Sequence, residues 1–125
     1  MTTKEVADQL VNLCRTGQYE EAQNSLYADH CVSVEPEGAM WSQRVEGMEA
    51  IKQKGAQWAA MVEEVHSAEV SDPIVAGGHF AVTMKNDVTF KEGGRQQIEE
   101  VAVYEVADGK IVKEQFFFPV APQQA

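Results

Sequence analysis

Hydrophobic residues recur at helical spacing directly after the start of the chain. Thr2 and Glu5 have the spacing of a capping box, a pattern typical of a helix N-terminus. Gly17 is a residue type that commonly ends a helix. Between them, apolar residues three and four positions apart form one stripe: Val6, Ala7, Leu10, Leu13 and Cys14. We therefore predict a first helix from Thr2 to Gly17.

Two further helices are predicted in the first half of the chain. A short one has Glu20 and Glu21 in its first turn, where acidic residues suit the helix dipole, and it ends near Asp29. The other begins at Gly47, and its apolar stripe predicts the most amphipathic helix of the three. That stripe consists of Met48, Ile51, Gly55, Trp58, Ala59 and Val62.

A strand is predicted between the second and third helices. The segment 31–35 carries valine at alternate positions and is halted by Pro36 and Gly38. The following segment, 37–46, has no periodic pattern and is predicted to be a loop that includes Trp41.

After the third helix the hydrophobic period changes to two. Four strand-like runs cover residues 65–75, 79–90, 96–106 and 111–118. They are separated by Gly77-Gly78, Gly93-Gly94 and Asp108-Gly109, pairs that tolerate the positive φ of hairpin turns. This order predicts an α+β domain in which three N-terminal helices pack on a curved, mostly antiparallel sheet that encloses a pocket.

Alternation separates the two faces of the predicted sheet. The more apolar face is assigned to the interior, because it can pack on the helices. It carries Phe80, Val82, Met84, Asn86, Val88, Ile98, Glu100, Ala102, Tyr104, Val106, Val112, Glu114, Phe116 and Phe118. The outer face carries Val101, Val103 and Phe117 among polar residues. Since exposed apolar patches tend to be covered, we expect a homodimer through this outer face.

Carboxylates on the apolar face are the main chemical signal. Glu100 and Glu114 interrupt that face, and Glu35 ends the first predicted strand. A buried carboxylate needs a partner or a raised pKa, so these three are predicted to be catalytic acid/base groups. The alternative is that each is solvated at a strand end in an ordinary ion pair. The predicted ligand-binding residues around them are Trp58, Val82, Met84, Asn86, Ala102, Tyr104, Phe116 and Phe118.

Histidine and cysteine residues give weaker evidence of function than the carboxylates. His66 and His79 are possible proton carriers, although a histidine beside a turn is more often a surface residue. Cys14 and Cys31 fall in apolar patterns and are predicted to be reduced core residues. No metal-ligand spacing, glycine-rich phosphate loop or nucleophile elbow is present, so neither a metal nor a cofactor is predicted.

Length and charge restrict the remaining functions. The chain has 125 residues, enough for one core, and we predict a single domain at 1–118 with a loosely held tail at 119–125. A formal net charge of -10 argues against binding to nucleic acids or anionic membranes. The apolar stretches are too short for a membrane span or a signal peptide, so a cytoplasmic location is expected.

Three segments of the chain carry a family resemblance. They are LYADHCVSVEPEG at 26–38, GMEAIKQKGAQW at 47–58 and VAVYEVADGKIVKEQFFF at 101–118. Together they resemble the SnoaL-like group of the nuclear transport factor 2-like superfamily, which includes steroid Δ5-3-ketoisomerases, polyketide cyclases and limonene epoxide hydrolase. The resemblance implies a cone-shaped α+β barrel, frequent dimers, and a general base at Glu35. It also implies that Glu114, Phe116 and Phe118 face the cavity.

Two departures from the isomerase pattern matter for function. The isomerases place an oxyanion-donating tyrosine where this sequence has Leu10, and a protonated acid where it has Ala102. Each such donor contributes about 3–4 kcal/mol to catalysis, so classical steroid isomerisation is not expected. Glu100 and Tyr104 are hypothetical replacements.

Three functions stay open at this level. The first is a cofactor-independent isomerase, cyclase or hydrolase in which Glu35 moves a proton on a small hydrophobic carbonyl compound or epoxide. The second is a non-catalytic binding module for a small apolar or weakly cationic ligand, since acidic residues favour a cation. The third is an interaction protein whose outer sheet face forms a homodimer. Whether the protein is an enzyme is undecided by the sequence.

Overall fold

The computed structural model describes residues 1–39 and 43–119. The helices are α1 (Thr3–Arg15), α2 (Tyr19–Leu26) and α3 (Met48–Met61). The strands are β1 (Tyr27–Val34), β2 (Arg44–Glu46), β3 (Val62–Val70), β4 (Ile74–Ala76), β5 (His79–Phe90), β6 (Gly94–Ala107) and β7 (Lys110–Phe117). The predictions for Trp41 and for the tail beyond Pro119 lie outside the described residues.

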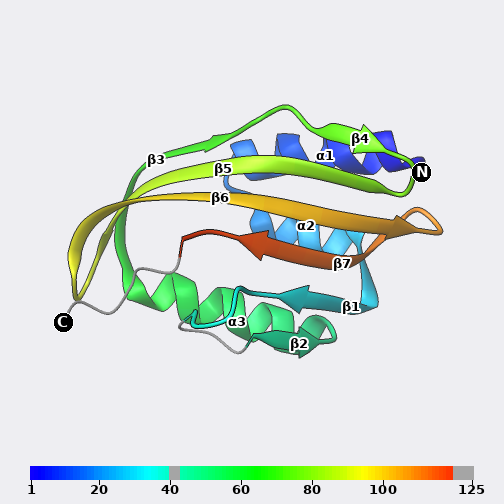
Figure 1. The fold of residues 1–125 in the computed structure, drawn as a ribbon. Helices are drawn as coiled ribbons and strands as arrows, with labels where there is room; N and C mark the ends of the chain where they lie inside the picture. Colours follow the sequence, from blue (N-terminus) through cyan, green and yellow to red (C-terminus); the bar gives the residue numbers. More distant parts are fainter. Residues whose placement is uncertain (40–42, 120–125) are drawn as a thin grey trace.

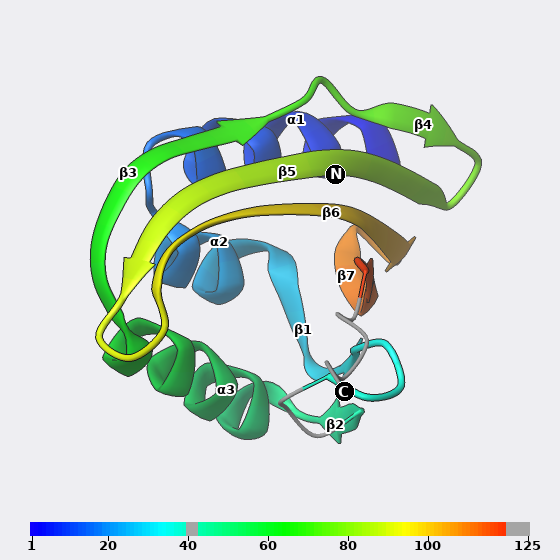
Figure 2. The same cartoon turned by 60° about the vertical axis from the view of Figure 1, so that its left-hand side comes forward.

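The strands form one mostly antiparallel sheet. Their order is β2-β1-β7-β6-β5-β3, with β4 paired to β5 beyond this path. Only the β1–β7 pair is parallel among the described strand pairs. Figures 1 and 2 show β3, β5 and β6 curving from the side of α1 toward α3. The predicted α+β class with a curved sheet is confirmed, whereas the enclosed pocket stays a prediction.

Local signals define the ends of the first two helices. At the start of α1, the Glu5 N–H donates to Thr2 Oγ1 at 3.1 Å and the Thr2 N–H donates to Glu5 Oε1 at 2.8 Å. This is the predicted capping box, and Gly17 follows the helix with φ +73°. The second helix ends at Leu26 rather than near Asp29, because the chain is already extended at Tyr27, where β1 begins.

Two strand predictions need correction. The run predicted at 65–75 is divided into β3 and β4 around Pro73, which lacks the N–H needed for ladder bonding. The segment predicted as the loop 37–46 contains β2, whose Arg44–Glu46 pairs with β1. The Asp108-Gly109 turn is confirmed: its φ values of 52° and 76° suit the two-residue hairpin between β6 and β7.

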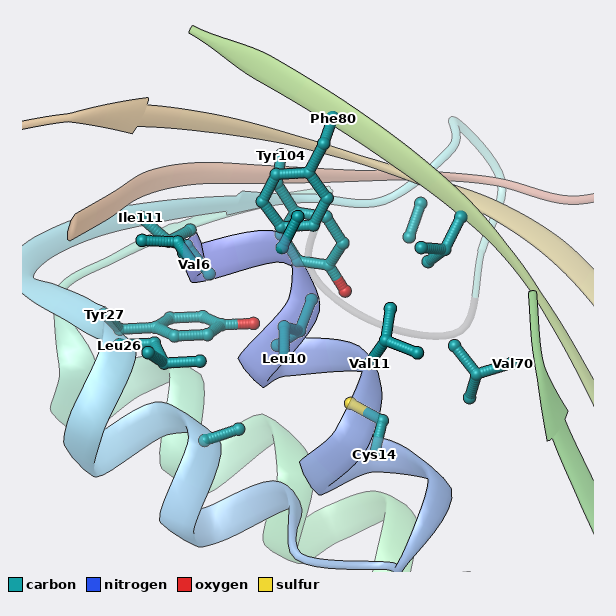
Figure 3. Close-up of a cluster of buried hydrophobic side chains, with 14 of the residues drawn as sticks. Val6, Leu10, Val11, Cys14, Leu26, Tyr27, Val70, Phe80, Tyr104 and Ile111 are labelled. Atoms are coloured by element: carbon teal, nitrogen blue, oxygen red, sulfur yellow. The ribbon is translucent and has the colours of Figure 1, made fainter. Parts of the chain in front are cut away.

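A hydrophobic core lies between α1 and the sheet (Figure 3). From α1 it receives Val6, Ala7, Leu10, Val11 and Cys14. Phe80 of β5 stacks on Tyr104 of β6 with ring centroids 4.8 Å apart. Both cysteines are buried, as predicted, and burial raises the pKa of each thiol to about 12.

The prediction that α3 is the most amphipathic helix is wrong, although Met48, Ile51, Trp58 and Val62 of its stripe are buried or half-buried. Ile51 is its only buried residue in α3, while Gly55 and Ala59 are exposed. The reason is the position of the helix, because α3 packs against β1, β2 and β3. Since β2 and β3 are the two end strands of the sheet order, α3 spans between the sheet edges rather than crossing the middle of a face.

Face alternation fails at the start of β7. The register between β6 and β7 shifts beside Glu105, so that Ile111 pairs with Val106. Ile111 is therefore fully buried and Val112 only half-buried, the reverse of the prediction. Beyond the shift the predicted parity holds, because Tyr104 and Ala102 are opposite Glu114 and Phe116.

Within the described residues, no helix combines the length and apolar character required to cross a membrane.

Candidate functional site

Glu114 is a buried carboxyl group on the inner face of β7. Its Oε1 atom accepts a hydrogen bond from the Tyr27 hydroxyl, and its Oε2 atom accepts one from Ser33 Oγ at 2.7 Å. Ser33 lies directly opposite Glu114 in the parallel β1–β7 pair, which explains this contact. Each oxygen of the carboxyl group thus has its own hydroxyl donor.

Lys54 of α3 connects this carboxyl group to Glu35. The Lys54 ammonium donates to Ser33 Oγ at 2.5 Å and to Glu35 Oε2 at 2.8 Å. Its Nζ atom also lies 5.3 Å from the centroid of the Phe116 ring. The hydrogen bonds form a continuous chain, here called the lysine network, of Tyr27, Ser33, Glu35, Lys54 and Glu114.

Glu100 lies beside the lysine network without joining it. It is on the inner face of β6, opposite Met84, and is half-buried. Within the described part of the chain it has no hydrogen bond or ion pair. Burial, followed by the negative charges of Glu35 and Glu114, raises the pKa of Glu100 from 4.5 to about 7. The positive charge of Lys54 opposes this rise.

Burial dominates the electrostatics of Glu114 and its neighbours. It raises the pKa of Glu114, while the hydrogen bonds from Tyr27 and Ser33 and the charge of Lys54 lower it. Burial also raises the pKa values of Tyr27 and Tyr104 well above 10.0, and the charge of Glu114 adds to both effects. Both hydroxyl groups therefore keep their protons at neutral pH, and Tyr27 donates its proton to Glu114.

The structure brings together the three glutamates that the sequence singled out. Glu35 and Glu114 are 6% and 4% exposed, so neither is a solvated carboxylate, but the ion pair expected in the alternative interpretation is present for Glu35, with Lys54. The charges of Glu35 and Glu114 each affect the pKa of Glu100. Their catalytic role stays a prediction.

The predicted ligand-binding residues differ in burial. Val82, Met84, Ala102 and Tyr104 are buried, whereas Trp58, Asn86, Phe116 and Phe118 are half-buried. The Trp58 ring meets Phe90 edge-on at 5.4 Å. Asn86 borders a small polar groove that Ser67 and Gln97 also line. The residues best placed to contact a molecule beside the lysine network are those flanking its carboxyl groups, above all Phe116.

His66 and His79, the possible proton carriers, contact residues outside the lysine network. His66 Nε2 lies 2.7 Å from Thr89 Oγ1, and its Nδ1 lies 3.3 Å from a Glu64 oxygen. His79 Nε2 lies 3.8 Å from Glu105. Both residues are exposed; His79 follows the Gly77-Gly78 turn, whereas His66 lies in the middle of β3.

Sequence reasoning missed three members of the network, Tyr27, Ser33 and Lys54. Lys54 is three residues after Ile51 and four before Trp58, so helical spacing placed it on the inward stripe. Ser33 alternates with Cys31 and Glu35, and these three are buried while the intervening valines are half-buried. Both signals were present in the pattern, whereas nothing local distinguishes Tyr27.

Among residues 1–39 and 43–119, no group of three or more histidine, cysteine, aspartate or glutamate side chains is placed to hold a metal ion.

Comparisons with known proteins agree with this fold. A solved protein from Mesorhizobium loti, described as a SnoaL-like polyketide cyclase, has 38% sequence identity and a TM-score of 0.87, covering 94% of this chain and 100% of that chain. An NTF2-like protein from Burkholderia thailandensis has 13% identity and a TM-score of 0.83, covering 96% and 92%.

A third similar structure is a protein with a ketosteroid isomerase-like fold from Catenulispora acidiphila, solved in complex with trimethylamine. It has 21% identity and a TM-score of 0.73, covering 95% of this chain and 88% of that chain. No curated protein matched the chain. The family model of the SnoaL-like domain matches residues 1–118. On this match, and on the likeness to the Mesorhizobium protein, the chain belongs to the SnoaL-like domain family.

Proposed function

We propose that this protein is a cofactor-independent acid/base enzyme that acts on a small hydrophobic carbonyl compound or epoxide, as an isomerase, cyclase or hydrolase. One observation carries the proposal. Glu100, a half-buried carboxyl group with a pKa of about 7, lies beside the lysine network and has no hydrogen-bond partner among the described residues. A group whose pKa is near the operating pH is well suited to both accept and return a proton.

Exposure divides the roles among the three carboxyl groups. Glu35 is paired with Lys54 and its side chain is 7% exposed, so its carboxylate is occupied and closed to solvent. Both oxygens of Glu114 accept hydrogen bonds from hydroxyl groups in the protein. The proposal therefore gives the proton transfer to Glu100, in place of the Glu35 base expected from the sequence. The charges of Glu35 and Glu114 then act by raising the pKa of Glu100.

For a carbonyl substrate the step is a simple proton abstraction. The Glu100 carboxylate removes a proton from the carbon next to the carbonyl group, and the C–H electron pair forms a carbon–carbon double bond. The carbonyl π pair moves to the oxygen, giving an enolate. Glu100 then returns the proton to another carbon in an isomerase. Classical steroid isomerisation is not proposed, because the buried residues Leu10 and Ala102 stand where the isomerases carry oxyanion donors.

An assay with a model ketone tests the proposal without knowledge of the natural substrate. We expect the protein to catalyse exchange of the α-protons of 2-tetralone in D2O, followed by proton NMR. Glu100→Gln should lower the exchange rate by about 100-fold or more, the usual contribution of a general base. Glu99→Gln is the matched control, since Glu99 is the exposed neighbour of Glu100 in β6. Full exchange by Glu100→Gln would overturn the assignment.

The same assay separates Glu35 from Glu100. Because Glu35 influences the pKa of Glu100 by its charge, Glu35→Gln should shift the pH profile of exchange to lower pH and retain activity. Loss of exchange with Glu35→Gln at every pH, together with full activity of Glu100→Gln, would return the role of base to Glu35.

The alternative function is a non-catalytic pocket for a small, weakly cationic ligand. It is favoured by the presence of Glu35, Glu100 and Glu114 around the single ammonium group of Lys54. The Catenulispora protein, which shares only the fold, was solved with trimethylamine. Mass spectrometry of ligand carried through purification, before and after long incubation, tests this function. Recovery of the ligand unchanged would support it.

A homodimer through the outer sheet face is proposed alongside either function. Val101 of β6 and Phe117 of β7 are directly opposite each other and are 40% and 48% exposed. Covering these side chains would remove apolar area from water. We expect a dimer in sedimentation experiments at micromolar concentration and a monomer for Phe117→Asp. A wild-type monomer would contradict this part of the proposal.

A further inference from the structure

Lys54 has a hydrogen-bonding capacity that the protein does not use fully. An ammonium group has three N–H donors. In the part of the chain that the structure describes, Lys54 donates to two acceptors, Ser33 Oγ and Glu35 Oε2. Its side chain is only 14% exposed, so bulk solvent has limited access to the remaining donor. A charged donor in such a place favours an acceptor brought by a bound molecule.

The groups around Lys54 determine which kind of molecule could reach its remaining N–H donor. Two contacts hold the ammonium beside β1, and its nitrogen also lies over the Phe116 ring of β7, 5.3 Å from the ring centroid. Phe116 is itself half-buried, and it is opposite Ala102 of β6, two residues from Glu100. A flat apolar molecule against Phe116 would therefore meet both Lys54 and the inner face of β6.

We propose that Lys54 binds an acceptor oxygen of the small molecule, so that the ligands of this site are compounds with a carbonyl, enolate or phenolate oxygen on an apolar ring. The inference rests on the proposed function, because it assigns an electrophilic partner to the same site. No part of the family pattern supplies this residue, since the expected donor positions hold Leu10 and Ala102.

The movement of charge during proton transfer agrees with this placement. When the Glu100 carboxylate takes up a proton, the negative charge leaves a position where Glu35 and Glu114 repel it. The charge arrives on the substrate oxygen, which in this arrangement lies beside the Lys54 ammonium. Fixed positive charge placed where negative charge develops is the most effective form of transition-state stabilisation.

A matched pair of probes isolates the oxygen contact. The probes are 2-naphthol and naphthalene, which have the same ring system and differ by one hydroxyl group. The key variant is the double substitution Lys54→Met with Glu35→Gln, which removes both members of the ion pair, so that Glu35 is not left as a buried charge without its partner. The control is Lys52→Met, the same change at an exposed position of the same helix.

The wild type should bind 2-naphthol more tightly than naphthalene. The double variant should lose about tenfold or more in affinity for 2-naphthol, the usual size of a charge-assisted hydrogen bond, and change by less than about twofold for naphthalene. Lys52→Met should change neither affinity. An equal loss for both probes in the double variant would overturn the inference, because it would give Lys54 a purely structural role.

A measurement on the wild-type protein covers the case in which the double variant does not fold. With carbon-13 labelled lysine, the Cε resonance of Lys54 is identified by its absence in Lys54→Arg. It should move on addition of 2-naphthol and stay in place with naphthalene. An unmoved resonance with saturating 2-naphthol would overturn the inference.

Two further results separate this inference from the proposed function. Tighter binding of 2-naphthylmethylammonium than of 2-naphthol would overturn the inference and favour the cationic ligand. If the Lys54 results hold while the wild-type protein catalyses no proton exchange, the enzymatic proposal fails and Lys54 remains a binding residue.

Discussion

The helices α1 and α3 pack against the same sheet in different ways. α1 buries five residues against the sheet and lies over the stacked rings of Phe80 and Tyr104. α3 buries only Ile51, and its Lys54 ends in a chain of hydrogen bonds with Ser33 and Glu35. The apolar side under α1 and the polar side facing α3 thus share one sheet face.

This difference shows which side of the sheet face carries the ionisable groups. A close-packed core accepts no molecule and tolerates no unpaired carboxyl group. Glu100 and Tyr104 are both on the inner face of β6, yet Tyr104 is 2% exposed and Glu100 is half-buried. Ser33, Glu35 and Glu114 are also buried, and on this side hydrogen bonds satisfy the polar groups in place of apolar contacts.

The largest expected effect is a loss of stability on the α1 side. Leu10→Ala should lower the free energy of unfolding by about 2–5 kcal/mol, because the emptied volume lies inside a packed core. Met48→Ala in α3 should cost clearly less, since Met48 is half-buried. Urea unfolding of both variants measures the two free energies. Equal losses would contradict the contrast between the helices.

The next largest expected effect is the loss of stability when Lys54 is replaced. Lys54→Met alone should lower the free energy of unfolding by about 3 kcal/mol near neutral pH, because it leaves the buried Glu35 without its partner. Without Lys54, the pKa values of Glu100 and Glu114 rise further. The loss should therefore shrink as the pH is lowered and these groups take up protons. A loss that grows toward low pH would contradict the assignment of charges.

A smaller effect follows from the raised pKa of Glu100. Its pKa in the folded state is about 7 against an ordinary 4.5, so the folded protein binds this proton more tightly than the unfolded chain. Stability is then lost as pH rises through that interval. Glu100→Gln should consequently be more stable than the wild type by about 2 kcal/mol at about pH 6, with little difference near pH 4.

Thermal or urea unfolding across this pH range measures the difference between Glu100→Gln and the wild type. A constant difference would show that the pKa of Glu100 is not raised. Glu99→Gln again serves as the control, because the exposed Glu99 side chain has water around it.

The smallest expected effect is a gain of stability in α3. Gly55 lies in the helix interior with a helical backbone, and an added Cβ atom would meet no other atom within 4 Å. Gly55→Ala should raise the free energy of unfolding by about 0.5–1 kcal/mol, because alanine loses less backbone entropy than glycine. Gly109→Ala should do the opposite, since its φ is +76° and the new Cβ would lie 3.0 Å from the Met1 nitrogen.

Much of the fold was predictable because its signals are local. The capping box at Thr2 and the Asp108-Gly109 turn depend on residues within three or four positions of one another. Face alternation along β5 and β6 also held, since a strand repeats every two residues. The same reasoning failed for Val112, where a register shift between two strands reverses the faces.

The candidate site was predictable only in part. Glu35, Glu100 and Glu114 were identified because acidic residues are conspicuous in apolar patterns. Their division into paired and unpaired groups was not predictable, because it depends on Lys54. Helical spacing puts Lys54 on the inward side of α3, but which acidic residue it pairs with is settled only when the helix is placed against β1.

The sequence by itself determined the helices, the hairpin turns, the family resemblance and the face on which the acidic residues lie. The tertiary structure alone decided which carboxyl group is left without a partner. The contacts that decide it join residues 19, 21 and 87 positions apart in the chain. Hydrogen-bond partners at such separations are chosen by strand register and by where α3 packs between the sheet edges. No pattern of neighbouring residues encodes these two features.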